Sequence, residues 1–249
     1  MGRMKLIIMN AYFYVLFLIS SAIVIPLLFL YVVFLSLFLQ NRRVMKRFRR
    51  CISWYGRVMT SVPFPFIRLR YEDCSGGGAD GGCIFVSNHR AASDAFLMCV
   101  LPHEAVQVVN TWPFYIPVIG RFAKMAGYLN IKKMTPELFN ERAESLLAEG
   151  VSIIFFPEGT RSGSREMGPF HGAAFRLALG SKAPIAPICI VGNENIPPKG
   201  SFLLRSGTIR VRRLPAIRWE EYRHFSVFAL KNRVRSIIES ELSLMENRA

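Results

Sequence analysis

The sequence predicts an α/β fold with a mainly parallel sheet flanked by helices, preceded by an N-terminal hydrophobic helical membrane anchor. Two features of its 249 residues support this prediction. The first is an apolar run, Leu6–Gln40, that contains no charged residue. The second is an alternation of short strand-like and helix-like segments after about residue 61, which is typical of parallel strands connected by helices. We therefore divide the chain into an anchoring region, residues 1–60, and a main domain, residues 61–249.

The elements of the main domain are assigned from apolar patterning and from turn residues. A glycine-rich turn, Ser75–Gly82, joins the first two strands. The predicted strands are Ile67–Tyr71, Cys83–Ser87, Val106–Val109, Tyr128–Ile131, Val151–Phe156 and Ile185–Val191. The predicted helices are Ser93–Leu101, Ile116–Ala126, Pro136–Glu149, Phe170–Leu179 and Phe228–Met245.

The apolar run is too long for one upright transmembrane helix, which needs about 20 residues, and short for two. Basic residues flank it on both sides, and basic flanks prefer the cytoplasmic side of a membrane. This favours a helical hairpin or re-entrant pair that bends at Ser20-Ser21 or at Pro26. The alternative is one long tilted helix. No small-residue cleavage site follows the run, so we expect a retained anchor rather than a secretory signal.

The formal net charge of +15 predicts a polyanionic partner, either a nucleic acid or an anionic membrane surface. Its placement favours the membrane, because juxtamembrane basic clusters attract anionic head groups. No nucleic-acid-binding motif accompanies the cluster, so we expect no nucleic acid partner. The main domain is expected to face the cytoplasm, at the inner membrane if the cell is bacterial. The basic residues directly after the apolar run are Arg42, Arg43, Lys46, Arg47, Arg49 and Arg50.

Apolar residues recur among these basic residues at helical spacing and predict a basic amphipathic helix. Such a helix lies on the membrane or against the domain, and an ordinary helix facing the core fits the pattern equally well. The apolar positions are Val44, Phe48, Ile52, Tyr55 and Met59.

The five cysteines are widely spaced and include no C-x-x-C pair, which argues against a disulfide framework and against a zinc site. We therefore expect a reduced, cytosolic setting and no bound metal.

The first candidate for chemistry is the segment Asn88–Asp94, directly after a predicted strand. An aspartate can hold one nitrogen of an imidazole and stabilise the charged ring, which leaves the other nitrogen free to take a proton. His89 and Asp94 are therefore a candidate base and its orienting carboxylate. Taken alone, the pair equally describes a surface histidine beside a helix capped by Ser93 or Asp94.

The second candidate is Phe156–Ser162, again directly after an apolar strand. Gly159 permits a tight turn, and its polar neighbours stand at the carboxyl end of the strand, where open α/β sheets bind ligands. Arg161 offers a planar fork suited to a phosphate or a carboxylate. Taken alone, the segment equally describes a polar loop with one exposed salt bridge.

Together, the two segments resemble the signature blocks of the glycerolipid acyltransferase family, which includes the lysophosphatidic acid acyltransferases. Two further segments resemble blocks of that family, Ile116–Lys133 and the strand Pro184–Ile188. The resemblance runs from about residue 61 to Val191, and four blocks in order are a specific signal. It implies that residues 61–249 form an acyltransferase domain.

The resemblance implies that the acyl group passes directly from a thioester to the acceptor hydroxyl. His89 acts as the base, and Asp94 orients it. The chain contains no G-x-S-x-G nucleophile elbow, which agrees with direct transfer. The implied partners are acyl-CoA or acyl carrier protein as donor and a lysophospholipid as acceptor, with no cofactor. The residues assigned to substrate binding are Asn88, Lys133, Glu158, Gly159, Thr160 and Arg161.

The sequence departs from the family pattern at Lys132-Lys133, where Asp-Arg is common, and at Asn110–Pro113 and Phe170–Ala173. These changes leave the His89–Asp94 pair intact but bear on the acceptor. Lysophosphatidic acid is the expected acceptor, and the alternative within the family is another lysolipid, such as a lyso-ornithine type. A membrane-bound scaffold without catalysis is the alternative from another class.

Overall fold

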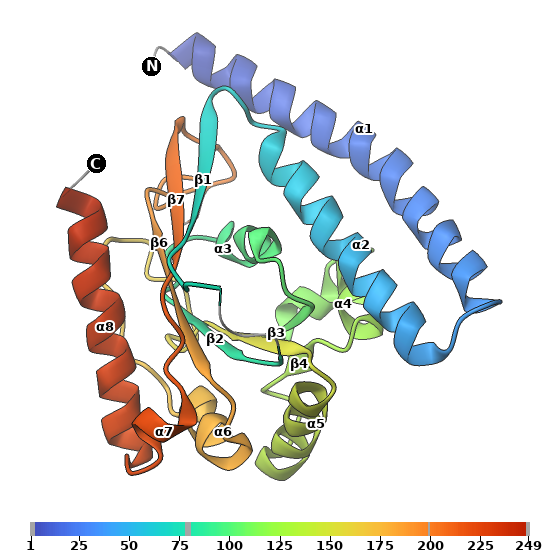
Figure 1. Cartoon of the computed structure of the whole chain (residues 1–249). Helices are drawn as coiled ribbons and strands as arrows, with labels where there is room; N and C mark the ends of the chain where they lie inside the picture. Colours follow the sequence, from blue (N-terminus) through green and yellow to red (C-terminus); the bar gives the residue numbers. More distant parts are fainter. Residues whose placement is uncertain (1–2, 78–80, 199, 248–249) are drawn as a thin grey trace.

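The computed structural model describes residues 3–77, 81–198 and 200–247, and its centre is a seven-stranded sheet (Figure 1). The spatial order is β1-β7-β6-β2-β5-β3-β4, and every neighbouring pair is parallel except β6 with β7. The strands are β1 (Ile67–Asp73), β2 (Ile84–Ser87), β3 (Ala105–Val109), β4 (Leu129–Asn130), β5 (Ser152–Phe155), β6 (Ile185–Val191) and β7 (Gly207–Arg213).

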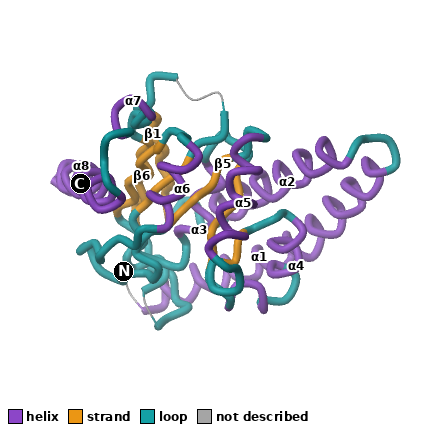
Figure 2. Tube along the Cα trace, turned by 90° about the horizontal axis from the view of Figure 1, so that it is seen from below, coloured by secondary structure: helices purple, strands orange, loops and turns teal. Residues whose placement is uncertain are grey.

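Helices cover both faces of the sheet, and the main domain agrees with the predicted alternation of strands and helices (Figures 1 and 2). The α-helices are α1 (Arg3–Ser36), α2 (Asn41–Ser61), α3 (Asp94–Leu97), α4 (Ile119–Met125), α5 (Pro136–Ala148), α6 (Ala173–Ser181), α7 (Trp219–Tyr222) and α8 (Val227–Asn247). Two 3₁₀-helices, η1 (Met98–Val100) and η2 (Trp112–Tyr115), complete the set.

The central strands are buried on both sides because successive side chains point to opposite faces of a sheet. Ile84 and Val86 of β2 enter the core formed with α5, α6 and α8. Phe85, between them, enters a second core formed with α3, η1 and the start of α1. All the residues of β2, β5 and β6 are buried, as expected of strands covered on both faces.

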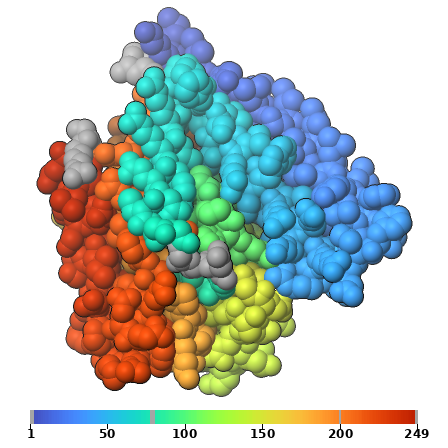
Figure 3. Space-filling model, viewed as in Figure 1, coloured from blue at the N-terminus to red at the C-terminus, as the bar shows by residue number. Residues whose placement is uncertain are grey.

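The first two helices form an antiparallel pair (Figure 1), and their atoms lie on the side of the domain opposite α8 (Figure 3). The helix α1 starts on the domain, where Met9 is fully buried and the Asn10 side chain bonds to both backbone groups of Leu204. Further along, Phe29 of α1 contacts Phe122 of α4. Contacts with the domain therefore occur near both ends of α1.

The preferred prediction of a bend inside the apolar run is wrong, and the alternative of one long helix is correct. The helix α1 continues through Ser20-Ser21 and through Pro26. A proline in a helix interior removes one backbone hydrogen bond and costs about 3 kcal/mol, but neighbouring helices make this tolerable. The chain reverses instead at residues 37–40, after which α2 returns along α1.

Two other differences concern the edge of the sheet. Strand β7 was not predicted, although its residues alternate between apolar and basic, with Ile209 and Val211 buried. The glycine-rich segment Ser75–Gly82 does connect β1 to β2, but these strands are separated in the sheet by β7 and β6. Its central residues, 78–80, lie outside the described part of the chain.

Candidate active site

The predicted pair of His89 and Asp94 forms at the carboxyl end of β2. His89 Nδ1 lies 2.7 Å from Asp94 Oδ2, and the Asp94 side chain is fully buried while that of His89 is 20% exposed. Since a carboxylate accepts, Nδ1 carries the proton in this arrangement, and Nε2 is the nitrogen that can act as a base. The imidazole ring also packs on Phe156, with ring centroids 4.6 Å apart.

The Asp94 carboxylate is held by donors on both oxygens. The backbone N–H groups of Arg90 and Ala91 donate to Oδ2, at 2.7 and 3.0 Å, beside the His89 contact. The side-chain amide of Asn193 donates to Oδ1. Sequence reasoning found neither Asn193 nor the buried Arg90 as functional candidates, because nothing local to the motif indicates them.

Glu158 lines the cavity, and its two carboxylate oxygens accept from backbone donors. Its Oε1 accepts from the backbone N–H of His89 and its Oε2 from that of Gly168, both at 2.7 Å, and only 6% of the residue is exposed. Burial raises the pKa of the Glu158 carboxyl, although the two N–H donors oppose this effect. These contacts favour a structural role for Glu158 beside His89, and its assignment to substrate binding stays a prediction.

Asn88, also predicted to bind substrate, pairs with the backbone of β6. Its side-chain amide donates to the carbonyl of Ile190 and accepts from the N–H of Ile190, at 2.9 and 2.8 Å. Asn88 is 1% exposed, so it continues the contact between β2 and β6 beyond the ends of the ladder. Both of its hydrogen-bonding groups are engaged by backbone.

His89 opens onto a cavity of about 950 Å³, which lies between the sheet and the helices α1, α2 and α4. This is near the upper end of the range of about 300–1,000 Å³ typical of ligand pockets. The wall is mainly apolar, and α1 contributes Ile25, Leu28 and Phe29 to it. The predicted residues Gly159, Thr160 and Arg161 all line the cavity, together with His171.

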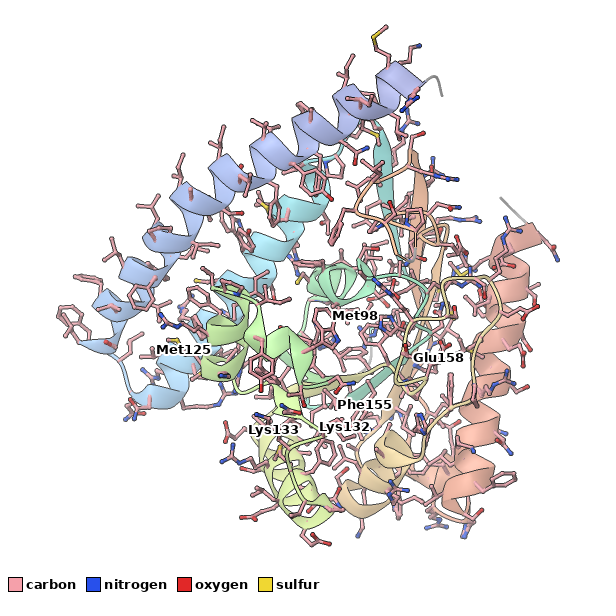
Figure 4. All side chains as sticks on the ribbon, turned by 180° about the vertical axis from the view of Figure 1, so that it is seen from behind. Met98, Met125, Lys132, Lys133, Phe155 and Glu158 are labelled. Carbon is pink, nitrogen blue, oxygen red and sulfur yellow. The ribbon has the colours of Figure 1, made fainter. Side chains whose placement is uncertain are left out.

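The two lysines between β4 and α5 are placed differently from one another (Figure 4). Lys132 lines the cavity, whereas the predicted Lys133 has its Nζ 5.5 Å from the centre of the Tyr115 ring and 3.4 Å from its hydroxyl. The basic side chains at the cavity are therefore Lys132 and Arg161. Gly159 adopts a positive φ of 72°, a conformation suited to glycine, in the turn that presents Arg161.

Among the described residues, no group of three or more histidine, cysteine or acidic side chains is arranged to hold a metal ion. The geometry instead provides one oriented imidazole, a basic rim and an apolar cavity. This combination can deprotonate a hydroxyl, bind an anionic group and accommodate a hydrocarbon chain.

Residues 68–191 match the family model described as Acyltransferase. The chain belongs to this acyltransferase family. It is 33% identical to the chloroplastic 1-acyl-sn-glycerol-3-phosphate acyltransferase of Brassica napus over 172 residues. This alignment covers 66% of this chain and 50% of that protein. It is 27% identical over 196 residues to the 1-acyl-sn-glycerol-3-phosphate acyltransferase of Limnanthes alba, covering 69% and 70%.

The chain thus spans about half the length of the Brassica relative. The crystal structure of the 1-acyl-sn-glycerophosphate acyltransferase from Thermotoga maritima superposes with a TM-score of 0.81 and covers 99% of this chain and 98% of that one. At 19% sequence identity, this similarity concerns the fold alone. The predicted fold class and family are therefore confirmed.

Proposed function

We propose that this protein transfers a fatty acyl group from an acyl thioester to the free hydroxyl of lysophosphatidic acid, which yields phosphatidic acid. The observation that carries the proposal is the His89–Asp94 pair at the wall of a large apolar cavity whose polar rim includes Arg161. The names of the relatives support the choice of lysophosphatidic acid as acceptor.

The reaction follows from the orientation of the imidazole. His89 Nε2 takes the proton of the acceptor hydroxyl as its oxygen attacks the thioester carbonyl carbon. The resulting imidazolium is stabilised by Asp94, as in a serine-hydrolase triad whose serine is replaced by the substrate. When the carbon–sulfur bond breaks, the thiolate leaves and His89 returns the proton to it. The new carbon–oxygen bond is the ester of the product.

The remaining parts of the site bind the two ends of the substrates. Arg161 can hold the phosphate of the acceptor through its planar fork, and Lys132 adds a second positive charge. Thr160, on the same loop, offers a hydroxyl. The apolar wall formed by α1, α2 and α4 accommodates an acyl chain, and the basic surface attracts either coenzyme A or an acidic carrier protein.

The anchor is proposed to lie along one leaflet, with the catalytic domain on the cytoplasmic side. Among the described residues, α1 is the one helix that is long enough and apolar enough to cross a membrane. At about 1.5 Å per residue its 34 residues exceed the hydrocarbon thickness of about 30 Å. However, α1 contacts the domain near both ends, at Asn10 and at Phe29, and a helix that crossed the bilayer would have to leave the domain. Its outward side chains are apolar, including Ile8, Leu18, Leu27 and Leu30.

A panel of lipids tests the substrate assignment. The purified full chain in mixed micelles is incubated with lysophosphatidic acid, lysophosphatidylcholine or a lyso-ornithine lipid, each with acyl-CoA and with acyl carrier protein thioester. We expect phosphatidic acid as the main product with at least one of the donors. Preferred acylation of the lyso-ornithine lipid would change the assigned acceptor and leave the assigned reaction, acyl transfer, in place. No acyl transfer with any pair of donor and acceptor would refute the proposed function.

Tags test the membrane arrangement. A tag placed before Arg3 and another placed in the loop at residues 37–40 should both be inaccessible from outside intact cells if α1 lies along the cytoplasmic leaflet. External labelling of one of the two would establish a crossing helix.

A further inference from the structure

The two oxygens of the buried Asp94 carboxylate accept different numbers of hydrogen bonds. Three donors, His89 Nδ1 and the backbone N–H groups of Arg90 and Ala91, all meet Oδ2. The donor to Oδ1 is the side-chain amide of Asn193, a residue that is 0% exposed. The torsion that turns a carboxylate about its Cβ–Cγ bond has broad minima, so donors on one oxygen alone fix its plane poorly.

The backbone is built to deliver Asn193 to this position. Strand β6 ends at Val191, and Gly192 then adopts a positive φ of 85° that turns the chain toward the site. A Cβ atom at Gly192 would lie 2.2 Å from the carbonyl oxygen of Thr208, so only glycine fits there. The turn that places Asn193 beside Asp94 therefore requires glycine at position 192.

Glu194, the residue after Asn193, bonds the same loop to Arg90 in the turn that starts at His89. Glu194 accepts a hydrogen bond from Arg90, which is 3% exposed and also pairs with Glu246 near the end of α8. The loop after β6 thus contacts both Arg90 and Asp94, on either side of the turn that starts at His89. Two contacts to one turn fix its orientation better than one contact would.

From this arrangement we propose that Asn193 is a positioning residue for the acyl transfer, resting on the proposed function of His89. By donating to Oδ1, Asn193 holds the plane of the carboxylate so that Oδ2 stays aligned with His89 Nδ1. The imidazole then keeps Nε2 directed into the cavity. A displacement of about 1 Å in such a group can cost roughly 10²-fold in rate.

Kinetics of matched variants test this role. Asn193→Leu keeps the size of the side chain and removes the donor, whereas Asn195→Leu alters an exposed residue of the same loop. For the full chain in mixed micelles, we expect Asn193→Leu to lower kcat by about 10- to 100-fold with KM values within about twofold, and Asn195→Leu to change neither. A near-normal kcat for Asn193→Leu would overturn the proposal.

A double-mutant cycle with Asp94→Asn separates positioning from a general structural role. If Asn193 acts only through Asp94, adding Asn193→Leu to Asp94→Asn should cost less than about twofold in kcat, because interacting residues are not additive. An equal loss in both backgrounds would mean that Asn193 supports the fold alone. Circular dichroism and Tm check each protein, and Asn193→Ser, which leaves a polar group too short to reach Asp94, serves as a second variant if the leucine is not tolerated.

A readout without substrate keeps this proposal distinct from the proposed function. The strongly hydrogen-bonded Nδ1 proton of His89 should give a low-field proton resonance, assigned by its loss in His89→Gln. We expect this resonance to move or broaden in Asn193→Leu or Asn193→Ser and to be retained in Asn195→Leu. If wild-type protein acylates no lysolipid, the proposed function fails while the resonance still decides the role of Asn193. An unchanged resonance in the Asn193 variants would refute the positioning role.

Discussion

The carboxylate of Glu158 accepts a hydrogen bond from the backbone N–H of His89 at 2.7 Å. The segment Phe156–Ser162 therefore holds the backbone of the segment Asn88–Asp94. The second oxygen of Glu158 accepts from the backbone N–H of Gly168, so backbone donors engage both oxygens of a residue that also lines the cavity. Glu158, which the sequence assigned to substrate binding, thus also holds the backbone of His89 in place.

Glu158→Gln should therefore lower kcat rather than raise KM. A glutamine places an NH₂ group against one of two N–H donors, which leaves one backbone donor unpaired and shifts the His89 turn. We expect a loss of about tenfold or more in kcat with the KM for lysophosphatidic acid within about twofold. Steady-state kinetics with varied acceptor decide between the roles, since a rise in KM alone would restore Glu158 as a substrate ligand.

Asn88→Ala should destabilise the protein without a specific effect on substrate binding. The substitution removes both partners of the Ile190 backbone groups in a buried setting, which costs about 2–4 kcal/mol. Thermal unfolding measures this loss, and Asn195→Ala, at an exposed position, should stay within about 0.5 kcal/mol of wild type. A stable Asn88→Ala protein with a raised acceptor KM would return Asn88 to the binding site.

Lys132 and Lys133 form a matched pair for testing the basic rim. Lys132 lines the cavity, whereas the ammonium group of Lys133 lies over the Tyr115 ring. We expect Lys132→Ala to raise the KM for lysophosphatidic acid by about tenfold, the effect of losing roughly 1.4 kcal/mol of binding, and Lys133→Ala to raise it less. The reverse order would favour the role that the sequence assigned to Lys133.

Arg161→Ala should raise the acceptor KM more than either lysine substitution does. Arg161→Lys should restore little of the loss, because a point charge lacks the planar fork. A full rescue by lysine would show that charge alone matters at this position.

Glu104 should make stability depend on pH. It pairs with Arg49 and Arg42 of α2, and both Glu104 and Arg49 have side chains less than a tenth exposed. Although burial acts to raise it, hydrogen bonds from these arginines hold the pKa of Glu104 below its ordinary value. Because the folded pKa is the lower one, the stabilisation is fully present above about pH 4.3, the ordinary pKa of a glutamate, and is lost as the pH falls through the folded pKa.

Glu104→Gln should therefore cost about 3 kcal/mol near neutral pH, and the difference from wild type should shrink in acid. Glu149→Gln is the control, since Glu149 pairs with Arg42 but is 44% exposed, and it should cost less than about 1 kcal/mol. Unfolding curves at several pH values test both expectations, and a Glu104→Gln difference that stays constant with pH would contradict the assigned ion pair.

The features predicted from the sequence are those coded by neighbouring residues. The strands β2, β5 and β6 are continuous apolar segments, and His89 and Asp94 lie five residues apart, so one turn contains both. The hydrogen bonds of Asn88 and Glu158 could not be predicted because their partners, Ile190 and the backbone of His89, come from distant parts of the chain.

Long-range pairing also explains what was missed. Asn193 lies 99 residues from Asp94, and only the pairing of β2 with β6 brings them together. The bend expected at Pro26 did not appear because packing on α2 and on the domain outweighs the hydrogen bond that proline removes. Local propensity could not reveal contacts of that kind.

The most direct measurement of the central claim is the kcat/KM for acyl transfer to lysophosphatidic acid in wild type and in His89→Ala, with folding checked by circular dichroism. General-base catalysis contributes about 10²–10⁴-fold, so we expect His89→Ala to lose about 10³-fold or more while its Tm and membrane binding stay close to those of wild type. Asp94→Asn should lose most of the activity as well, because the ring would adopt the wrong tautomer. A folded His89→Ala protein with activity within tenfold of wild type would contradict the account.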